Sequence, residues 1–477
     1  MEKINTYGLT VPEILLPAAT TDLKAWAVIA CDQHTQDREY WKRCEATAAG
    51  KPSTLHIILP EVYLGDADKQ ERIAAIHSAM EKYLKDGVFS TPKKCFIYIE
   101  RTTSYGRARK GLVTALDLEA YEWEPDSKAL VRATEATIVE RIPPRMEIRR
   151  GAALESPHIM LLANDDAKKL VEETGEIAKK GEPAYSTELM ENSGSLKGWI
   201  VDGTDELKRI EETLETLKKN GTGADGSSFL FAVGDGNHSL ATAKAVWNEF
   251  KLKNGGTKGA DGRISIPAGF ENHNARYALV EIVNIYDDGL TFEPIHRVLF
   301  NVDAELLAKT LCGKLGGKAE TCGSKEELDK KVSSAKGNIG LVTQKNGSPS
   351  YTLIRTDITD LVVSKLQPAL DEFLKAAQAA VSGATSGQTT NASSADDGTA
   401  ASGTASSAQK PEIDYIHGSD EVFRLGTKEN TVGILLPPIA KESFFSTIAG
   451  NGPLPRKSFS MGEASEKRFY FECRALF

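Results

Sequence analysis

The sequence predicts a mixed α/β protein built from more than one packed unit. Short apolar runs typical of buried strands alternate with charged stretches whose apolar residues recur at helical spacing. One such run, residues 229–233, passes through a glycine-rich loop directly into a helix-like stretch. The chain has 477 residues, which exceeds one average domain. We therefore expect α/β units that pack around separate cores.

The N-terminal segment, residues 1–129, is predicted to be mixed α/β. Residues 55–60 form a short apolar run that ends in proline, which favours a strand. Residues 69–83 carry apolar side chains at helical spacing. Two further runs, 95–99 and 111–116, are typical of strands.

The second segment, residues 130–290, is the predicted core. Residues 156–162 are expected to be a loop that leads into a buried strand, and 229–233 and 277–285 to be strands. The expected charged helices are 165–180 and 205–219. After the glycine loop, Leu240, Ala243, Val246, Trp247 and Phe250 share one helix face.

The third segment, residues 291–477, contains an insertion at 382–410 made almost entirely of small and polar residues. Such a stretch buries too little apolar surface to offset its ordering entropy. We expect a disordered loop, because ordered-looking sequence resumes at Ile413; a linker between independent domains is the alternative.

Composition narrows the classes of function. The formal net charge is −9 and the pI about 5.6, which argues against binding to a nucleic-acid backbone. We find no secretory signal and no apolar run long enough to span a bilayer. The six cysteines include no C-x-x-C pair, so disulfides and structural zinc are not expected. A cytoplasmic protein with small-molecule substrates fits; the oligomeric state stays open.

The strongest local signal is the loop Gly234-Asp235-Gly236-Asn237-His238-Ser239, between a predicted strand and a predicted helix. A helix N-terminus has unpaired backbone N–H groups and attracts phosphate, and glycines let the backbone approach an anion. Ser239 is a candidate N-cap or phosphate ligand. A tight turn that needs glycine only for its dihedral angles is the alternative. The loop matches neither the Walker nor the dinucleotide-binding pattern.

This loop, with Glu135 in the stretch Arg132-Ala133-Thr134-Glu135-Ala136-Thr137, resembles motifs of the free-serine kinases in the ParB/sulfiredoxin-like superfamily. The resemblance implies a ParB/sulfiredoxin-like core with N- and C-terminal elaborations. It also implies a kinase with Glu135 as catalytic base, and His238 and Asp235 in the catalytic site. The wider chain is similar to a large bacterial and archaeal family of unknown function, through the stretches 30–34, 59–61, 134–137, 234–239, 288–290 with 296–297, and 454–457.

The loop departs from the kinase pattern, because Asn237 and Ser239 stand where the kinases have His and Arg, and Thr134 replaces a histidine. Another cation must then neutralise the phosphate charge. The candidates are His296, Arg297, Arg456, Lys457 and the cluster Arg145, Arg149 and Arg150.

We expect Mg²⁺ as cofactor, with Asp235 as a possible ligand. Asp32, Gln33 and His34 are candidates for the acceptor pocket, whereas His158 has no partner that the sequence identifies. The predicted reaction is phosphoryl transfer from diphosphate, or from a nucleotide, to the hydroxyl of free L-serine. Phosphoserine hydrolysis and a non-catalytic ParB-like nucleotide- or DNA-binding module are the alternatives. A sulfiredoxin-like reductase would need a cysteine in the loop, and there is none.

Overall fold

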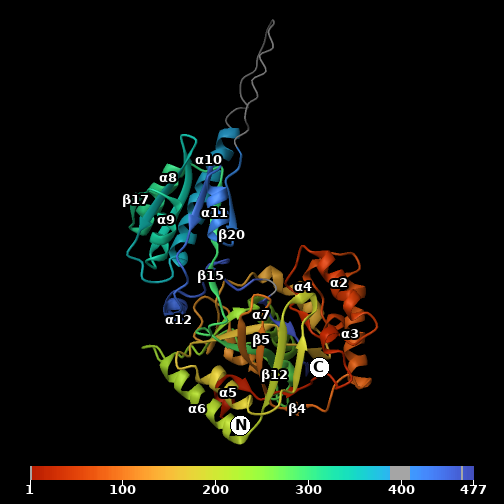
Figure 1. Ribbon diagram of the computed structural model, residues 1–477. Helices are drawn as coiled ribbons and strands as arrows, with labels where there is room; N and C mark the ends of the chain where they lie inside the picture. The colour runs from red at the N-terminus through yellow and green to blue at the C-terminus, as the bar shows by residue number, and fades with distance from the viewer. Residues whose placement is uncertain (1–2, 387–408, 464–465) are drawn as a thin grey trace. The chain divides into compact units, whose positions relative to one another are not determined.

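The computed structural model describes residues 3–386, 409–463 and 466–477 (Figure 1). It confirms a mixed α/β protein, and it divides into two compact units. The first unit is Met1–Thr291 together with Met461–Phe477, and the second is Phe292–Ser460. The predicted segments 1–129 and 130–290 thus belong to one unit, because their strands share a sheet. The last residues of the chain return to that unit.

A ten-stranded sheet forms the centre of the first unit. Its order is β11-β12-β5-β6-β14-β10-β13-β8-β7, with β1 beside β6. The central strands are buried along their whole length, which explains their continuous apolar runs. The strands are β1 Leu9–Thr10, β5 Phe96–Thr102, β6 Ala108–Asp117, β7 Tyr121–Glu122, β8 Val131–Ala133, β10 Ile159–Ala163, β11 Tyr185–Glu188, β12 Ser195–Val201, β13 Phe231–Asp235 and β14 Tyr277–Asn284.

The predicted helices 69–83 and 205–219 are confirmed as α3 and α6. In α6 the residues Ile210, Leu214 and Leu217 are buried on one face, and charged residues cover the other. The α-helices of this unit are α1 Leu23–Trp26, α2 Arg38–Ala48, α3 Lys69–Lys85, α4 Ile142–Arg149, α5 Thr174–Ala178, α6 Thr204–Asn220 and α7 Asn237–Lys253.

Two of the predicted elements differ in the structure. Residues 55–60 are not a strand; Thr54–Ile57 form a 3-10 turn in which Ser53 Oγ accepts from the N–H of Leu55. The expected helix 165–180 is replaced by a π-helical turn and the short helix α5. There the carboxylate of Asp165 accepts two backbone N–H groups that a regular helix would use otherwise.

Short strand pairs join the C-terminal segment, residues 466–477, to the beginning and middle of the first unit. Strand β3 (Val28–Ile29) pairs with β23 (Phe469–Tyr470), and β9 (Leu154–Glu155) pairs with β24 (Arg474–Ala475). A further pair joins β2 (Glu13–Ile14) to β4 (Lys93–Lys94). The C-terminal segment is therefore part of the core of this unit.

The second unit has a six-stranded sheet of order β17-β19-β18-β21-β16-β20. Its strands are β15 Phe292–Pro294, β16 His296–Phe300, β17 Lys318–Cys322, β18 Asn338–Lys345, β19 Ser348–Arg355, β20 Glu412–Ile416, β21 Thr431–Leu435 and β22 Phe459–Met461, the last residue of which belongs to the first unit. Its helices are α8 Ala304–Leu315, α9 Lys325–Ser333, α10 Val363–Ser386, α11 Ser419–Gly426 and α12 Lys441–Asn451 (Figure 1).

Helix α10 continues to Ser386, into the predicted insertion 382–410; residues 387–408 of that insertion lie outside the described residues. Among the helices that the structure describes, none has both the length and the apolar character needed to cross a membrane.

Candidate functional site

The order and direction of the strands in the first sheet bring the glycine loop and the Glu135 segment to the same end of the sheet. Strand β13 runs directly into the glycine loop, residues 234–239. Strand β8 is parallel to β13, so residues 134–138 leave the sheet at the same edge. Strand β10 is antiparallel to β13, so its beginning lies beside the loop, with Met160 opposite Asp235. Segments that are far apart in the sequence therefore meet at the N-terminus of α7.

Both loop glycines are required by packing. Gly236 caps α7 in the left-handed conformation with φ +79°, where a side chain is strained. A Cβ there would lie 3.1 Å from His158 Cδ2 and from the Cα of Ile159. A Cβ on Gly234 would lie 2.8 Å from the Leu162 side chain. The loop fits closely against β10, and this close fit sets its shape.

The N-terminus of α7 leaves backbone donors for an anion. The first intrahelical bond runs from the N–H of Leu240 to the carbonyl of Gly236. The N–H groups of residues 237–239 precede this bond, at the end of a helix where backbone donors point outward. The first turn carries no acidic residue. Ser239 is the third residue of the helix, so its expected role as N-cap is wrong; Gly236 holds that position.

Glu135 lies in a segment that is hydrogen-bonded to the glycine loop on both sides. Before it, the N–H of Thr134 donates to Asn237 Oδ1 at 3.3 Å, and Asn237 Nδ2 lies 3.3 Å from Thr134 Oγ1. After it, the N–H of Ile138 donates to His238 Nε2 at 3.2 Å. Thr134 and Asn237, two of the three residues that depart from the kinase pattern, thus contact each other. Glu135 itself is half-buried beside the loop.

The bond from Ile138 also assigns the tautomer of His238. Because Nε2 accepts an N–H, the neutral His238 ring carries its proton on Nδ1. His238 is therefore a hydrogen-bond donor through Nδ1.

Asp235 lies between the loop backbone and a lysine of the C-terminal segment. Its Oδ1 accepts the N–H of Gly236 at 2.9 Å, and its Oδ2 lies 3.2 Å from Lys467 Nζ. No group of three or more His, Cys, Asp or Glu residues in the described parts of the chain is suited to hold a metal ion. Mg²⁺ commonly takes one or two carboxylates together with substrate phosphates and water. Asp235 as a Mg²⁺ ligand stays a prediction, and both of its carboxylate oxygens have protein partners here.

A half-buried polar cluster adjoins Gly236. His158 Nε2 lies 3.4 Å from Asp32 Oδ2, and His158 Nδ1 lies 2.5 Å from Tyr470 Oη. The Tyr470 hydroxyl donates to Cys31 Sγ at 3.2 Å, and Gln33 Nε2 donates to Asp32 Oδ1 at 2.8 Å. The sequence identifies no partner for His158, but in the structure it contacts both Asp32 and Tyr470 and is the centre of this cluster.

Charge within the cluster shifts its pKa values. Burial raises the pKa of Asp32, but the attraction of His158 and the hydrogen bonds from His158 and Gln33 outweigh it, so the pKa lies below its usual range. Burial lowers the pKa of His158, but Tyr470 and the Asp32 carboxylate outweigh it and raise that pKa well above 6.5. The Asp32 carboxylate and the His158 imidazole thus each favour the charged form of the other.

A mainly apolar cavity of about 160 Å³ lies next to this cluster. Ser239 and Thr242 of α7 form part of its wall, as do His158, Tyr470 and Cys31. Its apolar lining includes Ile57, Leu59, Ile148, Leu154, Ile159 and Leu476. The cavity and the N-terminus of α7 therefore share Ser239.

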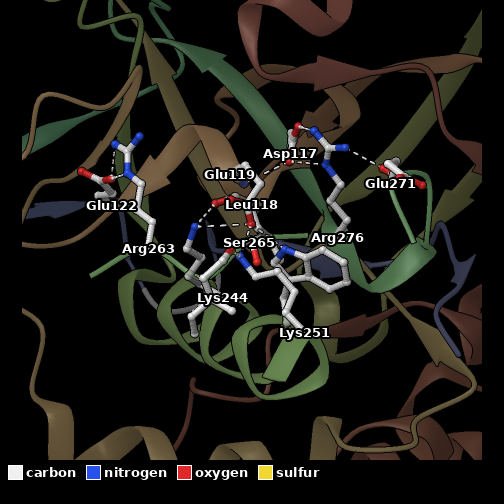
Figure 2. A network of polar contacts seen from close by, with 12 residues as sticks. Asp117, Leu118, Glu119, Glu122, Lys244, Lys251, Arg263, Ser265, Glu271 and Arg276 are labelled. Carbon is white, nitrogen blue, oxygen red and sulfur yellow. Dashed lines mark hydrogen bonds and ion pairs between the residues drawn. The ribbon is translucent and has the colours of Figure 1, made fainter. Parts of the chain in front are cut away.

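The other end of α7 is held by a buried polar network. Lys251 Nζ and Trp247 Nε1 each donate to Glu119 at 2.6 Å, and Lys244 Nζ donates to the carbonyl of Leu118 at 2.7 Å. Figure 2 shows both lysines reaching from the helix to residues 118 and 119. Burial raises the pKa of Glu119, but Lys244 and Lys251 outweigh this effect and lower it. The network fixes the helix whose first turn faces the site.

Several predicted site residues have other surroundings. His34 stacks on Tyr40 with ring centroids 3.7 Å apart, and burial lowers its pKa. Arg145 pairs with Glu61, Arg149 with Glu155 and Arg150 with Glu249. Each arginine of this cluster thus has a carboxylate partner within the first unit.

The remaining phosphate-binding candidates belong to the second unit. His296 accepts the N–H of Leu436, and burial lowers its pKa to about 4. Arg297 is fully buried, donates to Gln367 at 3.0 Å and lies over the ring of Tyr415. Arg456 and Lys457 are exposed in a turn before β22. Buried inside its own unit, Arg297 would have to leave these partners to bind a phosphate.

Sequence reasoning missed Lys467 and Tyr470. Neither belongs to a motif, and each meets its partner across more than two hundred positions. The short apolar runs around residues 469–471 are the one local sign that this segment is buried.

The solved structures similar to this chain include a free serine kinase in complex with AMP, with a TM-score of 0.36 and 10% identity over 75% of this chain and 90% of that one. They also include a conserved hypothetical protein from Pyrococcus furiosus, with a TM-score of 0.33 and 10% identity over 73% and 90%. C-terminally truncated SbnI from Staphylococcus aureus has a TM-score of 0.31 and 8% identity over 75% and 85%.

A search of the curated proteins finds no match. The profile of one protein family, "Protein of unknown function (DUF1015)", matches residues 15–373, which is most of the chain, and the chain therefore belongs to the DUF1015 family.

Proposed function

We propose that this protein is a kinase that transfers a phosphoryl group from diphosphate, or from a nucleotide, to the hydroxyl of free L-serine. The observation that carries the proposal is the double attachment of the Glu135 segment to the glycine loop through Thr134–Asn237 and Ile138–His238. A carboxylate is thereby held beside a helix N-terminus that has backbone donors for phosphate.

In this reaction the serine Oγ–P bond forms while the bond between phosphorus and the donor's bridging oxygen breaks. Glu135 accepts the hydroxyl proton, and the leaving phosphate or nucleoside phosphate keeps the electron pair. The N–H groups of Asn237, His238 and Ser239, with the Nδ1–H of His238, donate to the phosphate oxygens. A Mg²⁺ ion on these oxygens, with Asp235 as its protein ligand, would offset their negative charge.

The cavity beside Ser239 bears on the identity of the donor. Diphosphate needs only the N-terminus of α7, whereas a nucleotide also has a flat ring to bury. An apolar cavity of about 160 Å³ next to the first turn of α7 offers a place for that ring. This geometry favours a nucleotide over diphosphate as the donor.

Asp32 is the candidate contact for the acceptor. Its pKa is below the usual range, so it is ionised at neutral pH and can pair with the ammonium group of serine. Its side chain is 26% exposed, and it is therefore more accessible to a ligand than the side chain of its partner His158, which is 11% exposed. His34 has no hydrogen bond or ring contact to the glycine loop among the described residues, and its role in the acceptor pocket stays a prediction.

The test is product analysis by phosphorus NMR and mass spectrometry. Purified protein with Mg²⁺ and L-serine is incubated separately with diphosphate, ADP and ATP. We expect O-phosphoserine from at least one donor. If no donor yields phosphoserine, the kinase proposal is refuted, and incubation with O-phosphoserine then tests the hydrolase alternative by release of inorganic phosphate.

A further inference from the structure

We infer that Lys467, from the C-terminal segment, is the cation that binds the donor phosphates at the glycine loop. This inference rests on the proposed function and goes beyond it, because it assigns a residue outside every sequence motif. Asn237 and Ser239 stand where the kinase pattern has a cation, so the loop needs a positive charge from another part of the chain. Lys467 supplies that charge from more than two hundred positions away.

The position of Lys467 is fixed by its two neighbours. The backbone carbonyl of Glu466 accepts from Arg101 Nη1 at 2.7 Å, and its carboxylate accepts from Arg107 Nη2 at 2.6 Å. Arg468 donates to Glu281 at 2.5 Å and to Glu472 at 2.6 Å. A lysine between two residues held in this way loses little further backbone freedom when it binds a ligand.

The ammonium of Lys467 lies where phosphate charge would arrive. Its side chain is 14% exposed, and its Nζ is 3.2 Å from Asp235 Oδ2, in the residue that precedes the left-handed Gly236. Its charge also lowers the pKa of Asp32, the candidate acceptor contact, after the larger effects of burial, His158 and Gln33. The ammonium thus lies within electrostatic reach of both halves of the site.

The other candidate cations of the first unit are paired with carboxylates that are not part of the loop. Arg145, Arg149 and Arg150 each pair with a glutamate outside the residues 234–239. Lys467 differs, because the carboxylate that it pairs with is a member of the loop. An ammonium has three N–H donors, and a single ion pair leaves donors for phosphate oxygens.

The experiment measures diphosphate affinity by titration calorimetry with the divalent cations removed by EDTA, so that any metal at Asp235 has no effect. The variants are Lys467→Met, Asp235→Asn and the double variant. Lys253→Met is the matched control, since it removes a lysine that pairs with a glutamate at the far end of α7. We expect Lys467→Met to weaken binding about 10- to 100-fold, as for loss of a charge-assisted hydrogen bond, and the control to bind as the wild type does.

The double variant separates phosphate binding from simple neutralisation of Asp235. If Lys467 contacts phosphate, the double variant binds diphosphate at least about tenfold more weakly than Asp235→Asn alone. Equal affinity of these two variants would show that Lys467 only balances the aspartate, and would overturn the inference.

Failure of the inference can be told apart from failure of the proposed function. Wild-type protein that makes phosphoserine while Lys467→Met binds diphosphate normally refutes the inference alone. Lys467-dependent binding without phosphoserine formation refutes the kinase alone. Absence of diphosphate binding by the wild type overturns the role of Lys467 outright.

Discussion

Replacing Arg468 with methionine should destabilise the first unit strongly. The guanidinium is buried and donates to Glu281, to Glu472 and to the carbonyl of Pro157. Both carboxylates are buried, with 4% and 0% exposure, so the variant leaves them without their cation. Removing one partner of a buried ion pair costs about 3–5 kcal/mol. That is a large share of a typical unfolding free energy of about 5–15 kcal/mol.

Urea denaturation followed by tryptophan fluorescence measures this loss. All five tryptophans lie before residue 292, so their signal reports the first unit alone. Arg150→Met is the control, because its pair with Glu249 is partly exposed, and we expect it to cost less than about 1 kcal/mol. A loss below about 1 kcal/mol for Arg468→Met would refute the reasoning.

A second arm tests the physical cause. Changing Glu281 and Glu472 to glutamine in the Arg468→Met background removes the uncompensated charges, and should recover stability relative to Arg468→Met. No recovery would mean that the cost comes from lost packing or backbone contacts instead.

Three further predictions follow from the site. Glu135→Gln should lower kcat for phosphoserine formation by about 10²- to 10⁴-fold without loss of the fold. The control Glu140→Gln changes an exposed residue of the same segment and should leave kcat unchanged. Full activity of Glu135→Gln would remove Glu135 from the mechanism. The raised pKa of His158 means that its imidazolium stabilises the fold fully below the unfolded value of about 6.5, and that this stability is lost as pH rises through the folded pKa. His158→Gln should therefore lower the unfolding free energy more at about pH 6 than at about pH 9.5, and a constant difference would contradict this sign. Ile148→Trp, which fills the cavity, should raise KM for a nucleotide donor about tenfold or more and leave diphosphate binding unchanged; equal effects on both donors would separate the cavity from nucleotide binding.

Local patterns predicted the elements that depend on local sequence. Helices α3 and α6 and the strand–loop–helix around residues 231–253 follow from apolar periodicity and glycine placement. The run at 55–60 was misjudged because its apolar residues pack from a 3-10 turn. The helix expected at 165–180 was misjudged because the side chain of Asp165 competes for the backbone donors.

In the site too, the sequence pointed to the residues within short motifs but not to their partners from distant parts of the chain. The glycine loop and the Glu135 segment, both singled out in the sequence, are joined by hydrogen bonds, while their catalytic roles stay predictions. The partnerships of Lys467 with Asp235 and of Tyr470 with His158 were not predictable. They depend on a C-terminal segment that returns to the first unit after a whole second unit, and no periodicity within a short window encodes such a return.

That return has a consequence for how the protein is made. The second unit is inserted into the first. A ribosome therefore synthesises Phe292–Ser460 before it synthesises the C-terminal segment, which packs into the core of the first unit. At about 5–20 residues per second this delay is roughly 10 to 30 seconds. Throughout it, Glu281 is synthesised but Arg468 is not, and Glu155 has Arg149 but still lacks Arg474. The nascent first unit therefore lacks part of its core during this delay, while the whole of the inserted unit is already synthesised.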